Sequence, residues 1–246
     1  DHYRHSDVGK LIWAVSYGDK TNYPSKVGRC LTTAMADLDV TVDSHRRQYE
    51  CLDILNSKGL NPVKVALEHS HDIGLKFDVM FRMGIAGDIP PSGLCKEGFL
   101  VNRPELRMLA KDGTALELAS YAFPEVQQFQ LSLIREVVEK FDIDGIQLGW
   151  IRGPQFVGYE TPFVEDFKKE HGEDPRNLDV NDIRAQRLRA GYLTDFMRKV
   201  RHLLKELSDR RGRKIELAAW GFKAETNLFY GLDIETWLKE QLLDSL

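Results

Sequence analysis

The hydrophobic pattern of the chain alternates between two periods. Apolar runs and period-two alternation predict strands at 11–17, 75–82, 143–150 and 214–220. In the second of these, Phe77, Val79 and Phe81 share one face and the intervening residues share the other. Apolar stripes at three- and four-residue spacing predict helices at 44–58, 62–73, 124–141, 163–171, 181–208 and 233–243.

Strands that alternate with helices predict a parallel sheet, because parallel strands need a crossover connection. The stretch 83–122 is irregular and holds a possible fifth strand within 115–121. A closed eight-stranded barrel takes about 250 residues with short loops, whereas this chain of 246 residues has two long loops. We therefore predict an α/β fold, a parallel (β/α) TIM-type barrel that is incomplete. It would form a single domain over 1–246, truncated at one or both ends, with a further strand beginning at "LLDSL".

The composition narrows the range of partners. The chain is 42% hydrophobic and 29% charged with a net charge of −4, which argues against nucleic acid or an anionic membrane as the main partner. The sequence contains no run of 18 apolar residues, so it predicts no membrane span. The three cysteines are far apart and allow one disulfide at most. We expect neither a metal nor a cofactor, because no zinc, Walker or dinucleotide motif occurs. Nothing in the sequence sets the oligomeric state.

Strand alternation predicts which side chains reach the interior of such a barrel. If the more apolar face packs on the helices, the inward residues are Asp78, Met80, Arg82, Gln147, Gly149, Glu216, Ala218 and Trp220. Arg82, Gly149 and Trp220 then lie at the carboxyl ends of their strands, where barrel enzymes hold their sites. The guanidinium can donate two hydrogen bonds, and the indole offers a flat face for a sugar ring.

Each of these three residues also has a purely structural interpretation. Trp220 could be core at the barrel rim, and Arg82 could pair with the interior carboxylates of Asp78 or Glu216. Gly149 could only allow close packing.

The loop after the third predicted strand adds further candidates. "DIDGIQLGWIRGP" runs from that strand into a glycine-containing turn, and "GYETP" follows. We predict one cleft lined by Arg82, Trp150, Arg152, Tyr159, Glu160 and Trp220. Trp150 faces the helices by alternation unless the strand ends before it.

Several segments resemble a known family. "NRPELRMLAKDGT", "LASYAFPEVQQFQLSLIREVVEKFDIDGIQL" and "RGPQFVGYETPFVEDFKKEHGEDPR" are similar to glycosyl-hydrolase-like family 10 TIM-barrel proteins of the bacterial branch. The resemblance covers nearly the whole chain and implies a carbohydrate substrate and a secreted or periplasmic location. The wider family often has an active-site aspartate where this chain has Gly149, so the resemblance implies no catalytic aspartate at that position. The residues that do match the family pattern are Arg82, Arg152 and the Tyr159–Glu160 pair. Asp144 lies at the start of the strand and is expected to be structural.

The expected chemistry is glycoside hydrolysis, which needs two carboxylates. Glu160 is the predicted acid, with Gly149 leaving room for a ligand. The second carboxylate would lie beyond Leu246, with Asp88 and Glu225 as weaker candidates. One alternative is a carbohydrate-binding barrel that has lost catalysis, which Gly149 favours. A sugar-phosphate or aldol-type enzyme that uses Arg82 and Arg152 is a third possibility. Such an enzyme should have a lysine at a strand end or a phosphate-binding loop, and this sequence has neither.

Overall fold

The computed structural model describes residues 3–32, 43–86, 98–151 and 155–246. Its strands are β1 (Lys10–Tyr17), β2 (Lys20–Thr21), β3 (Arg29–Cys30), β4 (Lys76–Arg82), β5 (Arg107–Leu109), β6 (Ala115–Ala119), β7 (Gly145–Gly149) and β8 (Glu216–Trp220). Its α-helices are α1 (Asp43–Ser57), α2 (Pro62–Asp72), α3 (Phe99–Asn102), α4 (Pro124–Lys140), α5 (Thr161–His171), α6 (Ile183–Arg211) and α7 (Ile234–Lys239).

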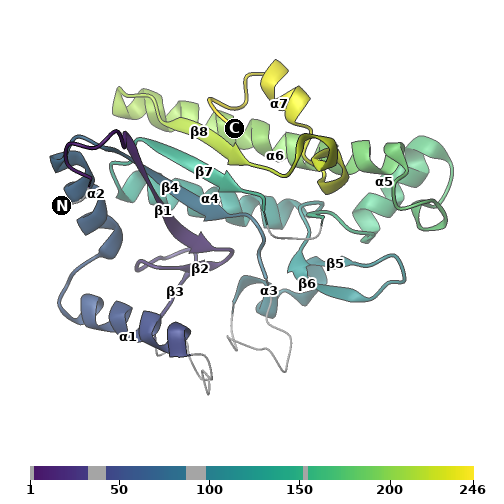
Figure 1. Ribbon diagram of the computed structural model, residues 1–246. Coiled ribbons are helices and arrows are strands. Elements are labelled where there is room, and N and C mark those ends of the chain that lie inside the picture. Colours follow the sequence, from purple (N-terminus) through teal and green to yellow (C-terminus); the bar gives the residue numbers. More distant parts are fainter. Residues whose placement is uncertain (1–2, 33–42, 87–97, 152–154) are drawn as a thin grey trace.

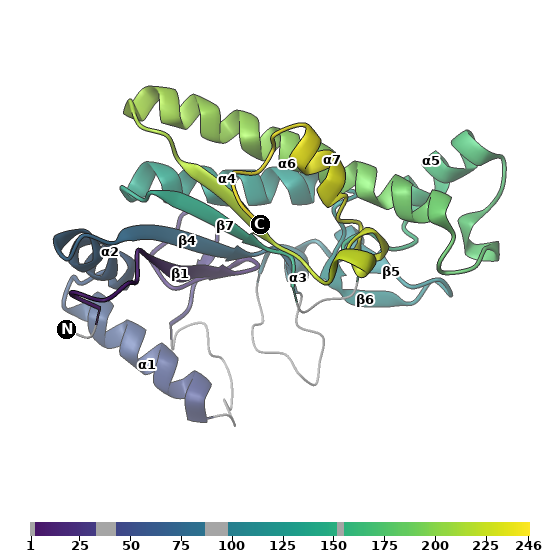
Figure 2. The same cartoon turned by 45° about the horizontal axis from the view of Figure 1, so that its top comes forward.

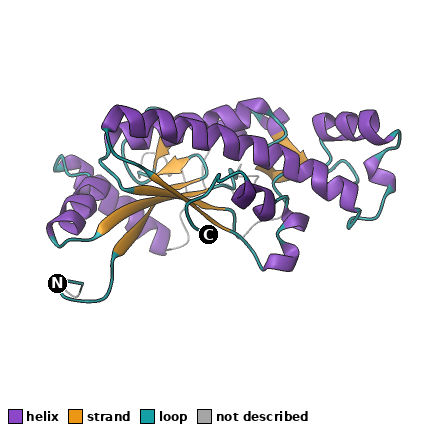
Figure 3. Cartoon of the chain, turned by 90° about the horizontal axis from the view of Figure 1, so that it is seen from above, coloured by secondary structure: helices purple, strands orange, loops and turns teal. Residues whose placement is uncertain are grey.

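A six-stranded sheet in the order β3-β2-β1-β4-β7-β8 forms the centre of the fold (Figure 1). The strands β1, β4, β7 and β8 pair in parallel and in chain order, as in part of a β/α barrel. The four predicted strands are therefore confirmed, each within two residues at either end. The sheet is twisted and open: the barrel is not closed by the described residues (Figure 3).

The two faces of this sheet differ. Helices α4 and α6 run side by side along one face (Figure 2), where alternate strand residues are apolar and fully buried. These residues are Phe77, Val79, Phe81, Ile146, Leu148, Leu217 and Ala219. On the other face, which we call the open face, Ile12 is 40% exposed and Trp220 is 36% exposed. The predicted assignment of the apolar face to the helices is correct.

The stretch 115–121 does form a strand, but it does not join the parallel sheet. Strand β6 pairs antiparallel with β5, and the two make a hairpin beside the end of the sheet (Figure 1). The tight turn of this hairpin uses Gly113, whose φ of +88° is one that glycine adopts without strain. The hairpin is thus an insertion between β4 and α4.

Asp144 fixes the amino ends of the strands, as the sequence predicted for a structural residue. Its Oδ2 accepts a 2.7 Å hydrogen bond from the backbone N–H of Phe77 and lies 2.9 Å from Nε2 of His71. Its Oδ1 pairs with Arg213 at 2.5 Å. The residue therefore joins α2, β4, β7 and the segment before β8.

The helices follow their predicted ranges with small differences at their ends. Asn61 caps α2 by accepting from the N–H groups of Val63 and Lys64. The helix α6 is capped at its C-terminus by Gly212, which has a φ of +66°. The predicted helix 233–243 is shorter, because α7 ends at Lys239 and Gln241 adopts a φ of +54°. Beyond it, Ser245 forms a parallel bridge with Ala218, where a further strand was predicted.

Candidate functional site

Four residues end the parallel strands in one row. Register pairs Tyr17 with Arg82, Arg82 with Gly149, and Gly149 with Trp220. We call these four residues the strand-end row. Carboxyl ends of parallel strands meet at one edge of a sheet, so side chains from distant parts of the sequence come together here. The structure thus brings the predicted residues Arg82, Gly149 and Trp220 to the same edge.

Tyr17 belongs to this row although alternation from the sequence places it on the helix face. The register of β1 against β4 shifts between Ala14 and Ser16, which is a β-bulge. One extra residue reverses the alternation beyond the bulge. The signal that could have found Tyr17 is its position as the last residue of the apolar run "LIWAVSY".

Arg82 does not pair with the interior carboxylates. Its guanidinium lies over the Tyr17 ring, 5.6 Å from the centroid, which is a cation–π distance. Lys10 occupies the carboxylates instead: its Nζ lies 2.8 Å from Asp78 Oδ2 and 2.9 Å from Glu216 Oε2. The structural alternative for Arg82, a pair with Asp78 or Glu216, is therefore wrong.

Trp220 is anchored at one edge and accessible elsewhere. Its Nε1–H donates to Oε1 of Gln147 at 2.9 Å, so the indole leans over the inner residues of β7. More than a third of the residue stays exposed, which does not fit the interpretation of Trp220 as rim core.

Gly149 leaves less space than the sequence suggested. A Cβ built on this residue would lie 3.2 Å from the sulfur of Met80 and 3.3 Å from the carbonyl oxygen of Phe81. The Met80 thioether therefore lies over the glycine, and close packing explains its small size. Any ligand there must displace or lie upon a flexible methionine.

Glu160 is placed differently from the expectation of an acid at the cleft. The residue is 1% exposed and ends the loop that leads into α5. Its carboxylate accepts hydrogen bonds from the N–H of Gly158 at 3.0 and 3.1 Å, from the N–H of Leu109 at 3.3 Å, and from the hydroxyl of Ser120. Burial raises the pKa of Glu160, although these hydrogen bonds act in the opposite direction. In this arrangement the carboxylate fastens the β5–β6 hairpin to the loop before α5.

Two further predicted cleft residues are core instead. Trp150 has no exposed surface and packs against Tyr121, Phe156, Phe196 and Trp237, so its side chain faces the helices. Strand β7 ends at Gly149, yet the chain keeps its alternation for one more residue.

Tyr159 is also buried. Its ring meets Phe163 edge-on at 5.8 Å, and the guanidinium of the buried Arg189 lies over it at 4.7 Å. Placing Trp150 and Tyr159 in the cleft was therefore wrong.

Two of the remaining candidates lie outside the described residues, and the third is exposed. Arg152 and Asp88 lie outside the described residues, within 152–154 and 87–97 respectively. Glu225 is exposed in a short 3-10 turn (Ala224–Thr226) after β8. The predicted single cleft at the strand ends stays a prediction.

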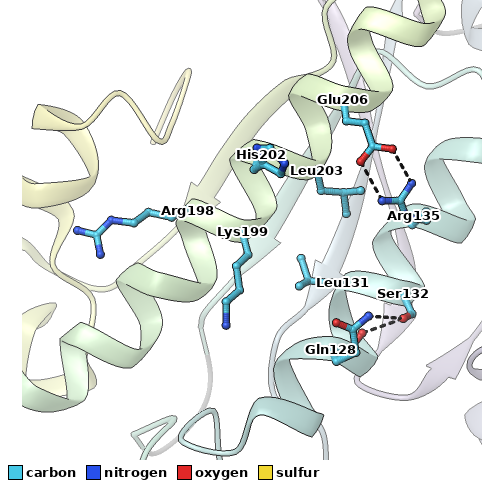
Figure 4. A pocket seen from close by; sticks show the side chains of 9 residues that line it. All are labelled: Gln128, Leu131, Ser132, Arg135, Arg198, Lys199, His202, Leu203 and Glu206. Carbon is cyan, nitrogen blue, oxygen red and sulfur yellow. Dashed lines mark hydrogen bonds and ion pairs between the residues drawn. The ribbon is translucent and has the colours of Figure 1, made fainter.

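A well-formed groove of about 500 Å³ lies elsewhere, between α4 and α6 (Figure 4). Its charged side chains are already paired. Arg135 forms hydrogen bonds of 3.2 and 3.1 Å with Glu206, and Lys199 donates to Gln127 at 2.6 Å. Arg198 at its rim turns away to pair with Glu240. The groove therefore presents little unmet hydrogen-bonding demand to a ligand.

Within the described ranges, no cluster of three His, Cys, Asp or Glu side chains has the spacing of a metal site. No helix in these ranges combines the length and apolar character needed to cross a bilayer.

Comparison with known families identifies the chain. The sequence model of glycosyl hydrolase-like 10 matches residues 38–246. The chain belongs to the glycosyl hydrolase-like 10 family. No curated protein matches it.

Solved structures agree with the fold of a glycosyl hydrolase-like 10 member. The chain is similar to alpha-L-fucosidase isoenzyme 2 from Paenibacillus thiaminolyticus, with 16% identity and a TM-score of 0.54. It is also similar to the PgaB (BpsB) glycoside hydrolase domain from Bordetella bronchiseptica, with 11% identity and a TM-score of 0.55. These matches cover 91% and 94% of this chain, but only 29% and 62% of the respective relatives. At such identities the likeness shows the fold alone: the open sheet corresponds to part of a TIM barrel.

Proposed function

We propose that this glycosyl hydrolase-like 10 chain supplies part of a glycosidase site that binds a carbohydrate across the strand-end row. The observation that carries the proposal is the alignment of Tyr17, Arg82, Gly149 and Trp220 at the carboxyl ends of neighbouring parallel strands. The names of the two similar structures, a fucosidase and a glycoside hydrolase domain, support a carbohydrate as ligand.

The side chains of the row suit the two kinds of surface that a sugar presents. Pyranose rings have apolar C–H faces, which pack on an exposed indole such as that of Trp220. Their hydroxyl groups accept hydrogen bonds, and a guanidinium presents five donors that never lose their proton near neutral pH. Arg82 would thus orient the sugar while Trp220 supplies most of the contact area.

Hydrolysis needs a general acid in addition to binding, and Glu160 as that acid stays a prediction. Its raised pKa suits an acid, because a proton would be held nearer neutral pH. Its burial and its three hydrogen-bond donors, Gly158, Leu109 and Ser120, instead suit a residue that fastens the hairpin.

Replacing Glu160 by Gln separates these roles. A general acid contributes about 10²–10⁴ in rate, so kcat would fall by that factor at an unchanged melting temperature. A structural role lowers the melting temperature and leaves kcat per folded molecule unchanged, and the contacts lead us to expect this second result. Ser120→Ala is the matched control, because it removes one donor of the same cluster and leaves the carboxylate in place.

A second candidate function is a barrel that binds carbohydrate without cleaving it. Gly149 favours this alternative, since it stands where the wider family often has a carboxylate. Testing a panel of aryl glycosides and polysaccharides with the full-length protein, for both turnover and binding, distinguishes the two. Turnover supports the hydrolase, binding without turnover supports the non-catalytic barrel, and the absence of both overturns a carbohydrate function.

The domain organisation and location follow the same proposal. Residues 1–246 would form one glycoside-hydrolase-like domain, and the protein would be secreted or periplasmic, where polymeric carbohydrates are found. Detection of the protein by immunoblot in the culture medium or periplasmic fraction tests this.

A further inference from the structure

We propose that Gln147 is a positioning residue, which fixes the Trp220 indole at the strand ends through a chain of hydrogen bonds across the open face. The inference rests on the proposed function, because it concerns how the indole meets a sugar.

The chain of contacts runs through four neighbouring strands, β8, β7, β4 and β1. Trp220 donates from Nε1–H to Gln147 Oε1 at 2.9 Å. Gln147 donates in turn from Nε2 to Asp78 Oδ2 at 2.6 Å. Lys10 donates to the same carboxylate oxygen at 2.8 Å, from the start of β1.

The two ends of this chain determine the orientation of the amide between them. The carboxylate of Asp78 accepts from Lys10, and an indole N–H can only donate. The Gln147 amide therefore satisfies both neighbours in one of its two orientations, with its oxygen toward Trp220. The opposite orientation would set two donors against each other and an oxygen against a carboxylate.

The inner part of the chain is shielded from water. Asp78 and Gln147 are buried, so the hydrogen bonds between them are stronger than on the surface and costly to break. Asp78 Oδ1 packs close to Gly145 on β7, where a Cβ would lie only 2.7 Å from it, so the carboxylate fits here because residue 145 has no side chain. The carboxylate of Glu216, on β8, is held by Lys10 and Lys76, whose Nζ atoms lie 2.9 and 2.7 Å from its oxygens. The support beneath the indole is therefore rigid.

The arrangement has a consequence for recognition. Because Gln147 occupies the indole N–H, Trp220 has no donor left for a sugar hydroxyl and offers only its ring. Holding the ring in one orientation before binding reduces the entropy lost when a ligand stacks on it. Gln147 thus acts on affinity through Trp220 without touching the sugar.

Replacing Gln147 by Leu tests the proposal, because Leu keeps an apolar body and removes both hydrogen bonds. Each Trp gives one indole N–H signal in a ¹⁵N–¹H spectrum, and Trp220→Phe assigns the signal of Trp220. We expect Gln147→Leu to shift this signal and to speed its exchange with water, while those of Trp13, Trp150 and Trp237 stay in place. Gln128→Leu, at an exposed glutamine of α4, is the matched control and should change none of them.

Binding supplies the second measurement, with the oligosaccharide of the panel that the unaltered full-length protein retains most strongly. We expect Gln147→Leu to weaken its binding about tenfold, which corresponds to about 1.4 kcal/mol, with KM raised more than kcat is lowered. Gln147→Met is used in the same way if the Leu variant does not fold.

The outcomes separate the inference from the proposed function. An unchanged Trp220 signal in Gln147→Leu overturns the positioning role, and so does a changed signal with undiminished sugar binding when Trp220→Ala abolishes that binding. Sugar binding that survives Trp220→Ala contradicts the proposed function instead. A moved signal in Gln147→Leu would then still support the contact with the indole.

Discussion

The two faces of the parallel sheet use the same strands for different purposes. On the helix face, Phe77, Val79, Leu148 and Leu217 are apolar and fully buried beneath α4 and α6. On the open face, the residues between them are largely polar and connect Lys10 to Trp220 through hydrogen bonds. The difference indicates that the helix face stabilises the fold by burial, while the open face holds side chains in place at the strand ends.

The largest expected effect is on the helix face. Leu148→Ala removes a fully buried side chain and should lower the free energy of unfolding by about 2–5 kcal/mol, as cavity-forming substitutions do. Met80→Ala, on the neighbouring strand but on the open face, should cost roughly 1 kcal/mol because the side chain is only half-buried. Urea denaturation of both variants measures the difference. Equal losses would contradict the contrast between the faces.

A smaller effect is expected where the open face is tightly packed. A methyl group at Gly145 would meet Asp78 Oδ1 at 2.7 Å and Glu216 Cβ at 3.0 Å. Gly145→Ala should therefore destabilise the protein by about 1–3 kcal/mol, as overpacking does.

Gly191→Ala is the control for this substitution, because nothing lies within 4 Å of the new methyl group on α6. It should be neutral or stabilising by up to about 1 kcal/mol. Thermal melts compare the pair, and a neutral Gly145→Ala would show that Asp78 is free to move.

At the amino ends of the strands, Asp144 makes stability depend on pH. Burial alone would raise the pKa of Asp144, but hydrogen bonds from Phe77 and His71, together with Arg213, lower it below its ordinary value of 3.8. The folded state thus binds this proton less readily than the unfolded state. Its stabilisation is complete above pH 3.8 and is lost as the pH falls through the lower folded pKa.

Comparison with Asp144→Asn isolates this contribution. The unaltered protein should be the more stable of the two at neutral pH, and this difference in stability should narrow as the pH falls below 3.8. Denaturant melts across this range measure it, and a gap independent of pH would remove Asp144 as its source.

The helix face was predictable from the sequence because its signal is periodic. Alternation and apolar stripes depend on neighbouring residues, so the four parallel strands and their inward residues Asp78, Arg82, Gln147 and Trp220 could be identified in advance. The hydrogen bonds between those residues could not, since they join positions about 70 residues apart in the chain.

Predictions for other residues of the site were wrong because of local features of the structure. A bulge in β1 brings Tyr17 into the strand-end row, and the alternation of apolar residues does not predict this bulge. Glu160 was predicted to be a loop acid at the cleft because the β5–β6 hairpin that buries it is an insertion with little periodicity. Trp150 was placed in the cleft on the assumption that the strand ends before it, but its side chain follows the alternation and is buried against four aromatic rings.

The most direct test of the central claim compares carbohydrate binding by two variants that each remove an exposed aromatic side chain. Trp220→Ala changes the strand-end row, whereas Tyr3→Ala changes an aromatic residue outside it that is 51% exposed. Across the oligosaccharide panel, we predict that Trp220→Ala weakens binding by about tenfold or more, about 1.4 kcal/mol, and that Tyr3→Ala has no effect. Equal binding by Trp220→Ala and the unaltered protein would contradict the assignment of the strand ends as the carbohydrate site.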